Sequence, residues 1–166
     1  ASSRLRSFPI LTITGPRQSG KTTLSRLLAP HLPYFTLEDP DTRAYASEDP
    51  RGFLRQVHEG AILDEVQRCP SLFSYLQGVV DAEKRFGQFI LTGSSQFDLI
   101  QSINQSLAGR TSIMTLLPFS LGELQSSGCA PSSVNELLFR GLFPPVHDRP
   151  VDPCVWIQDY VSTYLE

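Results

Sequence analysis

The sequence has few cysteines and no long hydrophobic run, and both shortages narrow the classes of protein to which it can belong. Its cysteines are Cys69, Cys129 and Cys154, an odd number at wide spacings without a Cys-x-x-Cys pair. Neither a disulfide framework nor a zinc site is therefore indicated, and a reducing, cytoplasmic setting is the simplest inference. No apolar run approaches the roughly 20 residues of a membrane span, and no signal-peptide pattern opens the chain, so we expect no membrane partner.

The sequence also lacks an excess of basic residues. Its formal net charge is −3 at pH 7, without the global basic footprint that nucleic-acid binders usually show. A local basic patch would not be visible in this total, so the composition neither indicates nor excludes DNA as a partner. His31, His58 and His147 are scattered, as surface or loop histidines are.

The 166 residues are enough for one ordinary domain, and 40% of them are hydrophobic, enough for a core. The chain begins at Ala1 without a methionine and stops at Glu166 within a helical pattern that no glycine or asparagine caps. We therefore expect it to be part of a longer protein. The composition changes beyond Pro118, which predicts a core domain over residues 1–117 and a helical lid or linker over residues 118–166.

A phosphate-binding pattern is present near the N-terminus. Residues 15–22 read Gly-Pro-Arg-Gln-Ser-Gly-Lys-Thr, which matches glycine, four residues, then Gly-Lys-Ser/Thr. Backbone N–H groups can curl around an anion only where bulky Cβ atoms are absent, and a helix starting at Lys21 would add the positive end of its dipole. The Lys21 ammonium would reach the β- and γ-phosphates, and the Thr22 hydroxyl would bind Mg²⁺. The predicted nucleotide-binding residues are Gly15, Pro16, Arg17, Gln18, Ser19, Gly20, Lys21, Thr22 and Thr23.

The residues around this pattern suit a strand-loop-helix unit. Residues 10–14 form a short β-branched run typical of a buried strand. Leu24, Leu27 and Leu28 then recur at helical spacing, and Pro30 would end the helix. The alternative is a glycine-containing turn between strand and helix with an ordinary surface lysine.

A second pattern resembles a Walker B segment. Residues 60–65 read Gly-Ala-Ile-Leu-Asp-Glu, an apolar strand that ends in two adjacent acids. Asp64 would hold Mg²⁺ through Thr22 or a water, and Glu65 would orient or deprotonate an attacking water. The alternative is that the two acids start a helix, where negative charge suits the dipole.

A third strand, residues 88–91, is followed by Thr92-Gly93-Ser94-Ser95. Because the carboxyl ends of parallel strands face the ligand, Thr92, Ser94 or Ser95 would lie near the γ-phosphate, and we take Ser94 as its polar sensor. The alternative is a strand that runs into a Gly-Ser turn.

Arg110 precedes the last predicted core strand, residues 111–116. It is a candidate arginine finger, a residue that steadies transition-state charge and is worth roughly 10³ to 10⁵ in rate. It is equally well explained as a surface cation or a salt-bridge partner.

The remaining patterns predict the elements around these segments. In chain order they are a strand over 34–37, a helical connection over 42–56 broken at Asp49-Pro50, a helix from Leu72 with Ser71 as N-cap, short helices over 97–103, 119–124 and 136–143, and a helix after Asp152 with Trp156, Tyr160 and Tyr164 on one packing face.

Taken together, residues 15–22, 62–65, 91–95 and 107–110 resemble a large prokaryotic family of AAA-type ATPases. The resemblance implies an α/β P-loop NTPase fold with a mostly parallel five-stranded sheet in the order 5-1-4-3-2, flanked by helices, plus a small helical C-terminal extension. It also implies ATP and Mg²⁺ as cofactors, hydrolysis by water that Glu65 activates, and a following C-terminal domain of uncharacterised, nuclease-like function, at whose start this sequence would stop. One departure is Gly141-Leu142-Phe143-Pro144, where the family has Gly-Gly-Phe-Pro.

The sequence therefore predicts an Mg²⁺-dependent ATPase domain, the motor or switch part of a larger protein. A small-molecule kinase is the first alternative, but residues 125–133 carry no arginine for a water-excluding lid. The second is a non-catalytic nucleotide switch, such as a DNA-associated regulator. The expected partners are ATP, a second copy of the chain that would receive Arg110, and DNA or a protein bound through the C-terminal domain.

Overall fold

The computed structural model describes residues 1–94 and 96–164, and it leaves out the side chains of residues 96–98 and 102. The chain divides into two compact units, which are described separately. The core unit comprises residues 1–15 and 21–116, and the C-terminal unit comprises residues 16–20 and 117–166. The interpretation of residues 118–166 as a lid that leads to a further domain stays a prediction.

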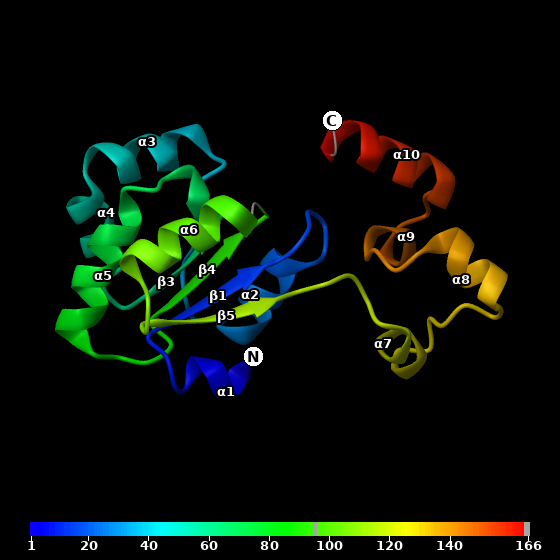
Figure 1. Cartoon of the computed structure of the whole chain (residues 1–166), viewed down its shortest axis with the longest axis horizontal. Helices are drawn as coiled ribbons and strands as arrows, with labels where there is room; N and C mark the ends of the chain where they lie inside the picture. Colours follow the sequence, from blue (N-terminus) through cyan, green and yellow to red (C-terminus); the bar gives the residue numbers. More distant parts are fainter. Residues whose placement is uncertain (95, 165–166) are drawn as a thin grey trace. The chain divides into compact units, whose positions relative to one another are not determined.

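The core unit is built on a five-stranded sheet in the order β2-β3-β4-β1-β5, with every pair of neighbours parallel. The strands are β1 (Ile10–Thr14), β2 (Tyr34–Thr36), β3 (Ala61–Asp64), β4 (Phe89–Gly93) and β5 (Thr111–Thr115), and Figure 1 shows β3, β4, β1 and β5 side by side. The predicted order 5-1-4-3-2 is confirmed. Because the strands are parallel, all their carboxyl ends lie at one edge of the sheet.

Helices connect these strands. They are α1 (Ser2–Leu5), α2 (Lys21–Leu28), α3 (Pro40–Glu48), α4 (Pro50–Gln56), α5 (Leu72–Glu83) and α6 (Gln96–Ser106), with a 3₁₀ turn over Val66–Arg68. The predicted break at Asp49-Pro50 is confirmed, because the Asp49 side chain accepts a hydrogen bond from the backbone of Gly52 at 2.8 Å and caps α4. The predicted cap of α5 is wrong. Ser71 makes no capping bond, and its hydroxyl lies 3.6 Å from the Cys69 sulfur instead.

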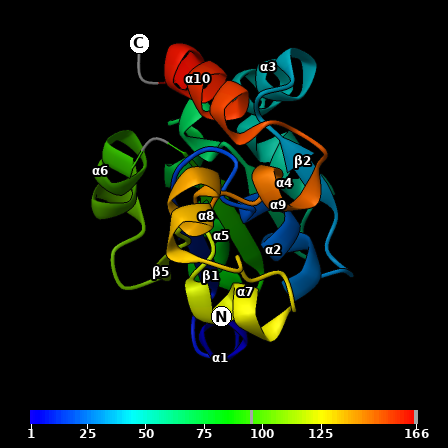
Figure 2. The same ribbon diagram turned by 90° about the vertical axis from the view of Figure 1, so that its right-hand side faces the viewer.

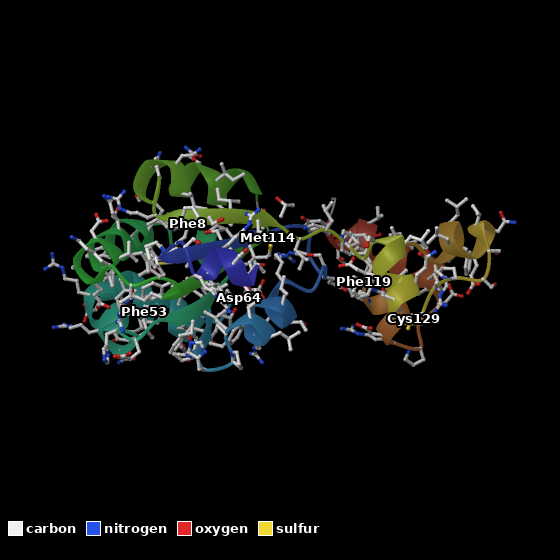
Figure 3. All side chains as sticks on the ribbon, turned by 90° about the horizontal axis from the view of Figure 1, so that it is seen from below. Phe8, Phe53, Asp64, Met114, Phe119 and Cys129 are labelled. Atoms are coloured by element: carbon white, nitrogen blue, oxygen red, sulfur yellow. The ribbon has the colours of Figure 1, made fainter. Side chains whose placement is uncertain are left out.

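Two hydrophobic clusters cover the two faces of the sheet. Adjacent residues of β4 alternate between them, with Phe89 and Leu91 in the first cluster and Ile90 in the second. The first cluster also contains side chains from α3, α4, α5 and α6, among them Phe53, which Figure 3 labels. Leu24 of α2 packs against the second cluster. The core unit is therefore a sheet between two helical layers, and it holds β1, β3 and β4 rigidly from both faces.

The C-terminal unit contains four helices in its described part, coloured from yellow to red in Figure 2: α7 (Leu121–Ser126), α8 (Val134–Arg140), α9 (Pro145–Asp148) and α10 (Pro153–Tyr164). The helix predicted to start at residue 119 begins later, because Ser120 and Glu123 form a capping box at its N-terminus. The last helix begins directly after Asp152, as predicted, and Asp152 accepts a bond from the backbone N–H of Cys154 at 2.8 Å.

Aromatic side chains of α10 pack together within the C-terminal unit. Trp156 and Tyr160 stack with ring centroids 5.0 Å apart, and Phe143 lies 5.3 Å from Trp156. The Tyr160 hydroxyl donates to the backbone oxygen of Arg17 at 3.3 Å. This stripe is a packing surface, as the sequence predicted. In the part of the chain that the structure describes, no helix combines the length and apolarity required to cross a membrane.

Candidate active site

The loop of residues 15–20 runs from the end of β1 to the start of α2, and its backbone adopts conformations that favour glycine. Gly15 has φ 145°, Gly20 has φ 93°, and the non-glycine Gln18 has φ 60°. Ser19 is only 5% exposed, and among the described residues its hydroxyl has no hydrogen-bond partner. A buried hydroxyl without a partner costs about 1–3 kcal/mol. Such a donor suits an anion, and it is the observation by which this loop fits a phosphate group.

Lys21 is the first residue of α2 and is buried, with 6% of its surface exposed. Its ammonium donates to the backbone oxygen of Gly15 at 3.0 Å. A buried cation is tolerated only when polar atoms surround it, so the loop carbonyl compensates for lost hydration. Lys21 therefore places positive charge at the N-terminus of α2, where the helix dipole adds to it. Thr23, also predicted to bind nucleotide, lies exposed in the first turn of α2.

Asp64, at the end of β3 and labelled in Figure 3, receives hydrogen bonds from three different elements. One carboxylate oxygen accepts from the Thr22 hydroxyl of α2 at 2.8 Å and from the Tyr34 hydroxyl of β2 at 2.5 Å. The other accepts from the Thr92 hydroxyl of β4. A hydroxyl beside a carboxylate supplies the oxygen ligands that Mg²⁺ prefers, so Thr22 and Asp64 fit the predicted metal site.

Tyr34 is tied to this site by charge as well as geometry. Burial, together with the hydrogen bond to the Asp64 carboxylate, raises the pKa of Tyr34 to about 12. The guanidinium of Arg26 lies over the Tyr34 ring, 3.9 Å from its centroid. The hydroxyl therefore keeps its proton at neutral pH and acts as a donor to Asp64.

Glu65 follows Asp64 and has a left-handed backbone with φ 53°, a strained conformation for a side chain of this size. One of its carboxylate oxygens accepts from the Ser94 hydroxyl at 2.9 Å, from the Ser94 backbone at 3.3 Å, and from the Gln67 side-chain amide. The backbone N–H of Glu65 donates to the Thr92 hydroxyl at 3.4 Å. Both acids are thus held by the residues that end β4.

The three candidate sensor residues have different outcomes. Thr92 contacts Asp64, and Ser94 contacts Glu65. Ser95 lies outside the described residues. The structure brings Ser94 into the carboxylate cluster, while its role as a γ-phosphate sensor stays a prediction.

Arg110 does not join this cluster. It immediately precedes β5, and its backbone oxygen accepts from Ile10 at the start of β1, so it lies at the amino edge of the sheet. Five strand residues separate it from the carboxyl edge, about 16 Å at 3.3 Å per residue. Its guanidinium donates twice to Asp81, at 2.7 and 2.8 Å, and this pair raises the pKa of Arg110 and lowers that of Asp81. Arg110 therefore lies away from the carboxylate cluster of its own chain, and its role as an arginine finger stays a prediction.

Two residues of this cluster were not predicted from the sequence. Tyr34 was assigned to a strand, and Gln67 was given no role. Both lie close to the predicted acids, since Tyr34 pairs with Ile62 across β2 and β3, and Gln67 is two residues beyond Glu65. The sequence carries a signal only for Gln67, its closeness to Glu65, and none for Tyr34.

Comparison with known proteins gives the class to which this site belongs. A family model described as an AAA domain matches residues 7–125. The whole chain is 34% identical to the uncharacterized protein Rv2008c of Mycobacterium tuberculosis and to the uncharacterized protein Mb2031c of Mycobacterium bovis, and it spans 38% of the length of each.

Two solved structures have the same fold at low sequence identity. The Walker-type ATPase PABY2304 of Pyrococcus abyssi is 16% identical with a TM-score of 0.58, over 97% of this chain and 69% of that one. The ORC2 protein of Aeropyrum pernix, in its ADP form, is 15% identical with a TM-score of 0.51, over 75% of this chain and 47% of that one. The chain belongs to the AAA-domain family, and is an ATPase-like nucleotide-binding domain.

Proposed function

We propose that this chain binds ATP together with Mg²⁺ and hydrolyses the β–γ phosphoanhydride, as the motor or switch part of a larger protein. The observation that carries the proposal is the hydrogen bond of 2.8 Å between Thr22 and Asp64. It joins the helix that follows the phosphate-binding loop to the strand that ends in the two acids. Because the chain spans 38% of its relatives' length, further segments of such proteins would supply what the ATPase acts on.

Each residue of the cluster has a role in this reaction. The loop N–H groups of residues 17–20 and the Lys21 ammonium bind the phosphate oxygens, and Thr22 and Asp64 hold the cation. Bound Mg²⁺ would neutralise charge on the β- and γ-phosphates. Glu65 takes a proton from the water whose oxygen attacks the γ-phosphorus, and ADP leaves. Ser94 keeps the Glu65 carboxylate in place through two hydrogen bonds.

A nucleotide-dependent switch with very slow turnover is the second candidate. Three donors bind one oxygen of Glu65, and each stabilises the carboxylate where it stands. If that arrangement persists with nucleotide bound, the chain would bind ATP and change partner affinity without rapid hydrolysis. No observation favours the kinase, whose water-excluding lid would need arginines that residues 125–133 do not have.

The decisive test is phosphate release from ATP with Mg²⁺ and without any added acceptor. We expect Glu65→Gln to lower the rate at least about 100-fold while ATP binding persists, because the general base is lost. Lys21→Ala should weaken ATP binding itself. Glu59→Gln is the matched control, since Glu59 is an exposed acid paired with Arg85, and its rate should equal that of the wild type.

Phosphate release by Glu65→Gln at the wild-type rate would remove Glu65 from the mechanism. Tight ATP binding without release by any version would instead support the switch. Release that depends on an added hydroxyl compound would support the kinase.

A further inference from the structure

The Glu65 carboxylate is hydrogen bonded unevenly. All three donors that the structure describes, the Gln67 amide and the hydroxyl and backbone N–H of Ser94, bind the same oxygen, Oε2. Among the described atoms, which leave out residue 95 and the side chains of residues 96–98 and 102, no hydrogen bond reaches the other oxygen, Oε1. A carboxylate held by one oxygen keeps a defined orientation and leaves the second oxygen available to accept a proton.

The hydrogen bond to Glu65 fixes the orientation of the Gln67 amide and leaves the amide oxygen without a donor. Its Nε2 donates to Glu65, while its Oε1 is buried and, among the described residues, lacks a hydrogen-bond partner. The reversed amide would place an oxygen against the carboxylate, which can only accept, so repulsion excludes it. A buried acceptor without a donor costs free energy that an apolar side chain of the same size would not. Packing alone therefore does not explain a glutamine here.

The end of β4 provides the space for this amide. A Cβ atom on Gly93 would lie 2.4 Å from Oε1 of Gln67 and 2.8 Å from a methyl of Leu99. Gly93 directly precedes Ser94, the other residue that binds Glu65. At the end of β4, Gly93 therefore makes room for the Gln67 amide, and Ser94 supplies the other two donors to Glu65.

We infer that Gln67 is a positioning residue for the reaction proposed above: its amide fixes Oε2 of Glu65, so that Oε1 faces the attacking water. This inference rests on the proposed hydrolysis by Glu65. It implies that the chain gives up some stability at Gln67 for the sake of catalysis, as strained functional sites often do.

The chain contains a matched control for this claim. Gln88 is 3% exposed, donates from Nε2 to a carboxylate oxygen of Glu83 at 2.8 Å and to the backbone of His58 at 3.0 Å, and also has a buried Oε1 without a partner in the described chain. It immediately precedes β4 and so lies at the amino edge of the sheet, away from Asp64 and Glu65.

The experiment compares Gln67→Met with Gln88→Met in phosphate release, ATP affinity and melting temperature. Methionine matches glutamine in length and carries neither a strong donor nor a strong acceptor. We expect Gln67→Met to lower kcat about 10- to 100-fold, because a loosened base attacks from a poorer geometry, with ATP affinity within about twofold of the wild type. Its melting temperature should equal or exceed that of the wild type. Gln88→Met should retain the wild-type kcat.

An unchanged kcat in Gln67→Met, beside a loss in Glu65→Gln, would overturn the inference and leave the proposed function intact. A lower melting temperature with kcat lowered equally in both glutamine variants would show a structural role only. Absence of phosphate release by the wild type would count against the proposed function instead.

A measurement that does not depend on activity tests whether Gln67 and Glu65 are coupled by their hydrogen bond. In urea unfolding of the nucleotide-free chain, Gln67→Met and Glu65→Ala should fail to add in their effects on the midpoint, because each removes the same hydrogen bond. Gly93→Ala should resemble Gln67→Met in kcat and have little further effect when combined with it. Additive midpoints would show that Gln67 and Glu65 are not coupled, and would overturn the inference whatever the enzyme's rate.

Discussion

Tyr34 supports Asp64, the acid that we propose as a Mg²⁺ ligand, from a strand that carries no motif. Its hydroxyl and that of Thr22 donate to the same oxygen of Asp64, at 2.5 and 2.8 Å. Groups that hydrogen-bond a metal ligand fix its orientation, and their loss typically lowers metal affinity 10- to 100-fold. The guanidinium of Arg26 packs over the Tyr34 ring. Tyr34 therefore belongs to the site, although nothing in its type or spacing indicates it.

Tyr34→Phe should raise the Mg²⁺ concentration needed for half-maximal phosphate release about tenfold, because Asp64 loses one of its fixed donors. ATP binding without Mg²⁺ should stay unchanged, and excess Mg²⁺ should restore most of the rate. A Mg²⁺ titration of phosphate release measures this.

The control for this substitution is Tyr45→Phe. Tyr45 also uses its hydroxyl in a hydrogen bond, from Gln56 at 3.1 Å, but on an exposed part of α3. Identical Mg²⁺ requirements for the two variants would mean that Tyr34 does not position Asp64.

Among the elements, β3 ends at Asp64 and leads directly into Glu65, and a single glycine sets where it starts. Gly60 has φ 116°, and a Cβ atom there would lie 2.0 Å from the backbone oxygen of Gln88. That oxygen accepts from Ala61 at 3.1 Å, the first ladder bond between β3 and the chain entering β4. Neither the backbone at Gly60 nor that at Gln88 can move away without disturbing the strand register that places Asp64 and Glu65 beside Thr92.

Gly60→Ala should therefore lower the free energy of unfolding by about 2–3 kcal/mol, through both the positive φ and the backbone clash. Gly109→Ala is the comparison, since Gly109 has φ 76° but open space around its Cβ position, and it should cost only about 1 kcal/mol. Urea unfolding measures both. An equal loss of unfolding free energy in the two variants would show that the clash of the new Cβ atom with Gln88 costs nothing.

The elements that the sequence could predict are those whose pattern is local. The strand before the phosphate loop and the strand that ends at Asp64 are predicted correctly because apolar runs define them. The predicted sheet order agrees with the structure because it came from the family resemblance and not from the residue pattern. The 3₁₀ turn at Val66–Arg68 and α9 were not predicted, since three- and four-residue turns have no periodicity. The contact of Tyr34 with Asp64 depends on a neighbouring strand that no spacing reveals, and no motif indicates the contact of Gln67 with Glu65 two residues before it.

At the scale of the whole molecule, Arg110 raises the question of a second copy. It lies beside β5, an edge strand of the sheet, and is 31% exposed while paired with Asp81. The pair lowers the pKa of the Asp81 carboxyl, so its contribution to stability is present above the unfolded value of 3.8 and is lost as pH falls below it. Arg110→Ala should therefore lower the urea midpoint slightly at pH 7 and leave it unchanged in acid, where Asp81 is protonated in both states.

That stabilising role is separate from catalysis, and mixing two inactive variants distinguishes them. If Arg110 acts as a finger on a neighbouring copy, Arg110→Ala should lose about 10³-fold or more in phosphate release. Glu65→Gln is inactive for a different reason and still presents Arg110. Mixed chains should then recover part of the wild-type rate, since an intact Glu65 in one copy meets an intact Arg110 from the other, and recovery should rise with protein concentration. Wild-type release by Arg110→Ala would leave the arginine only its pair with Asp81. Loss without recovery on mixing would count against action of Arg110 across a boundary between copies.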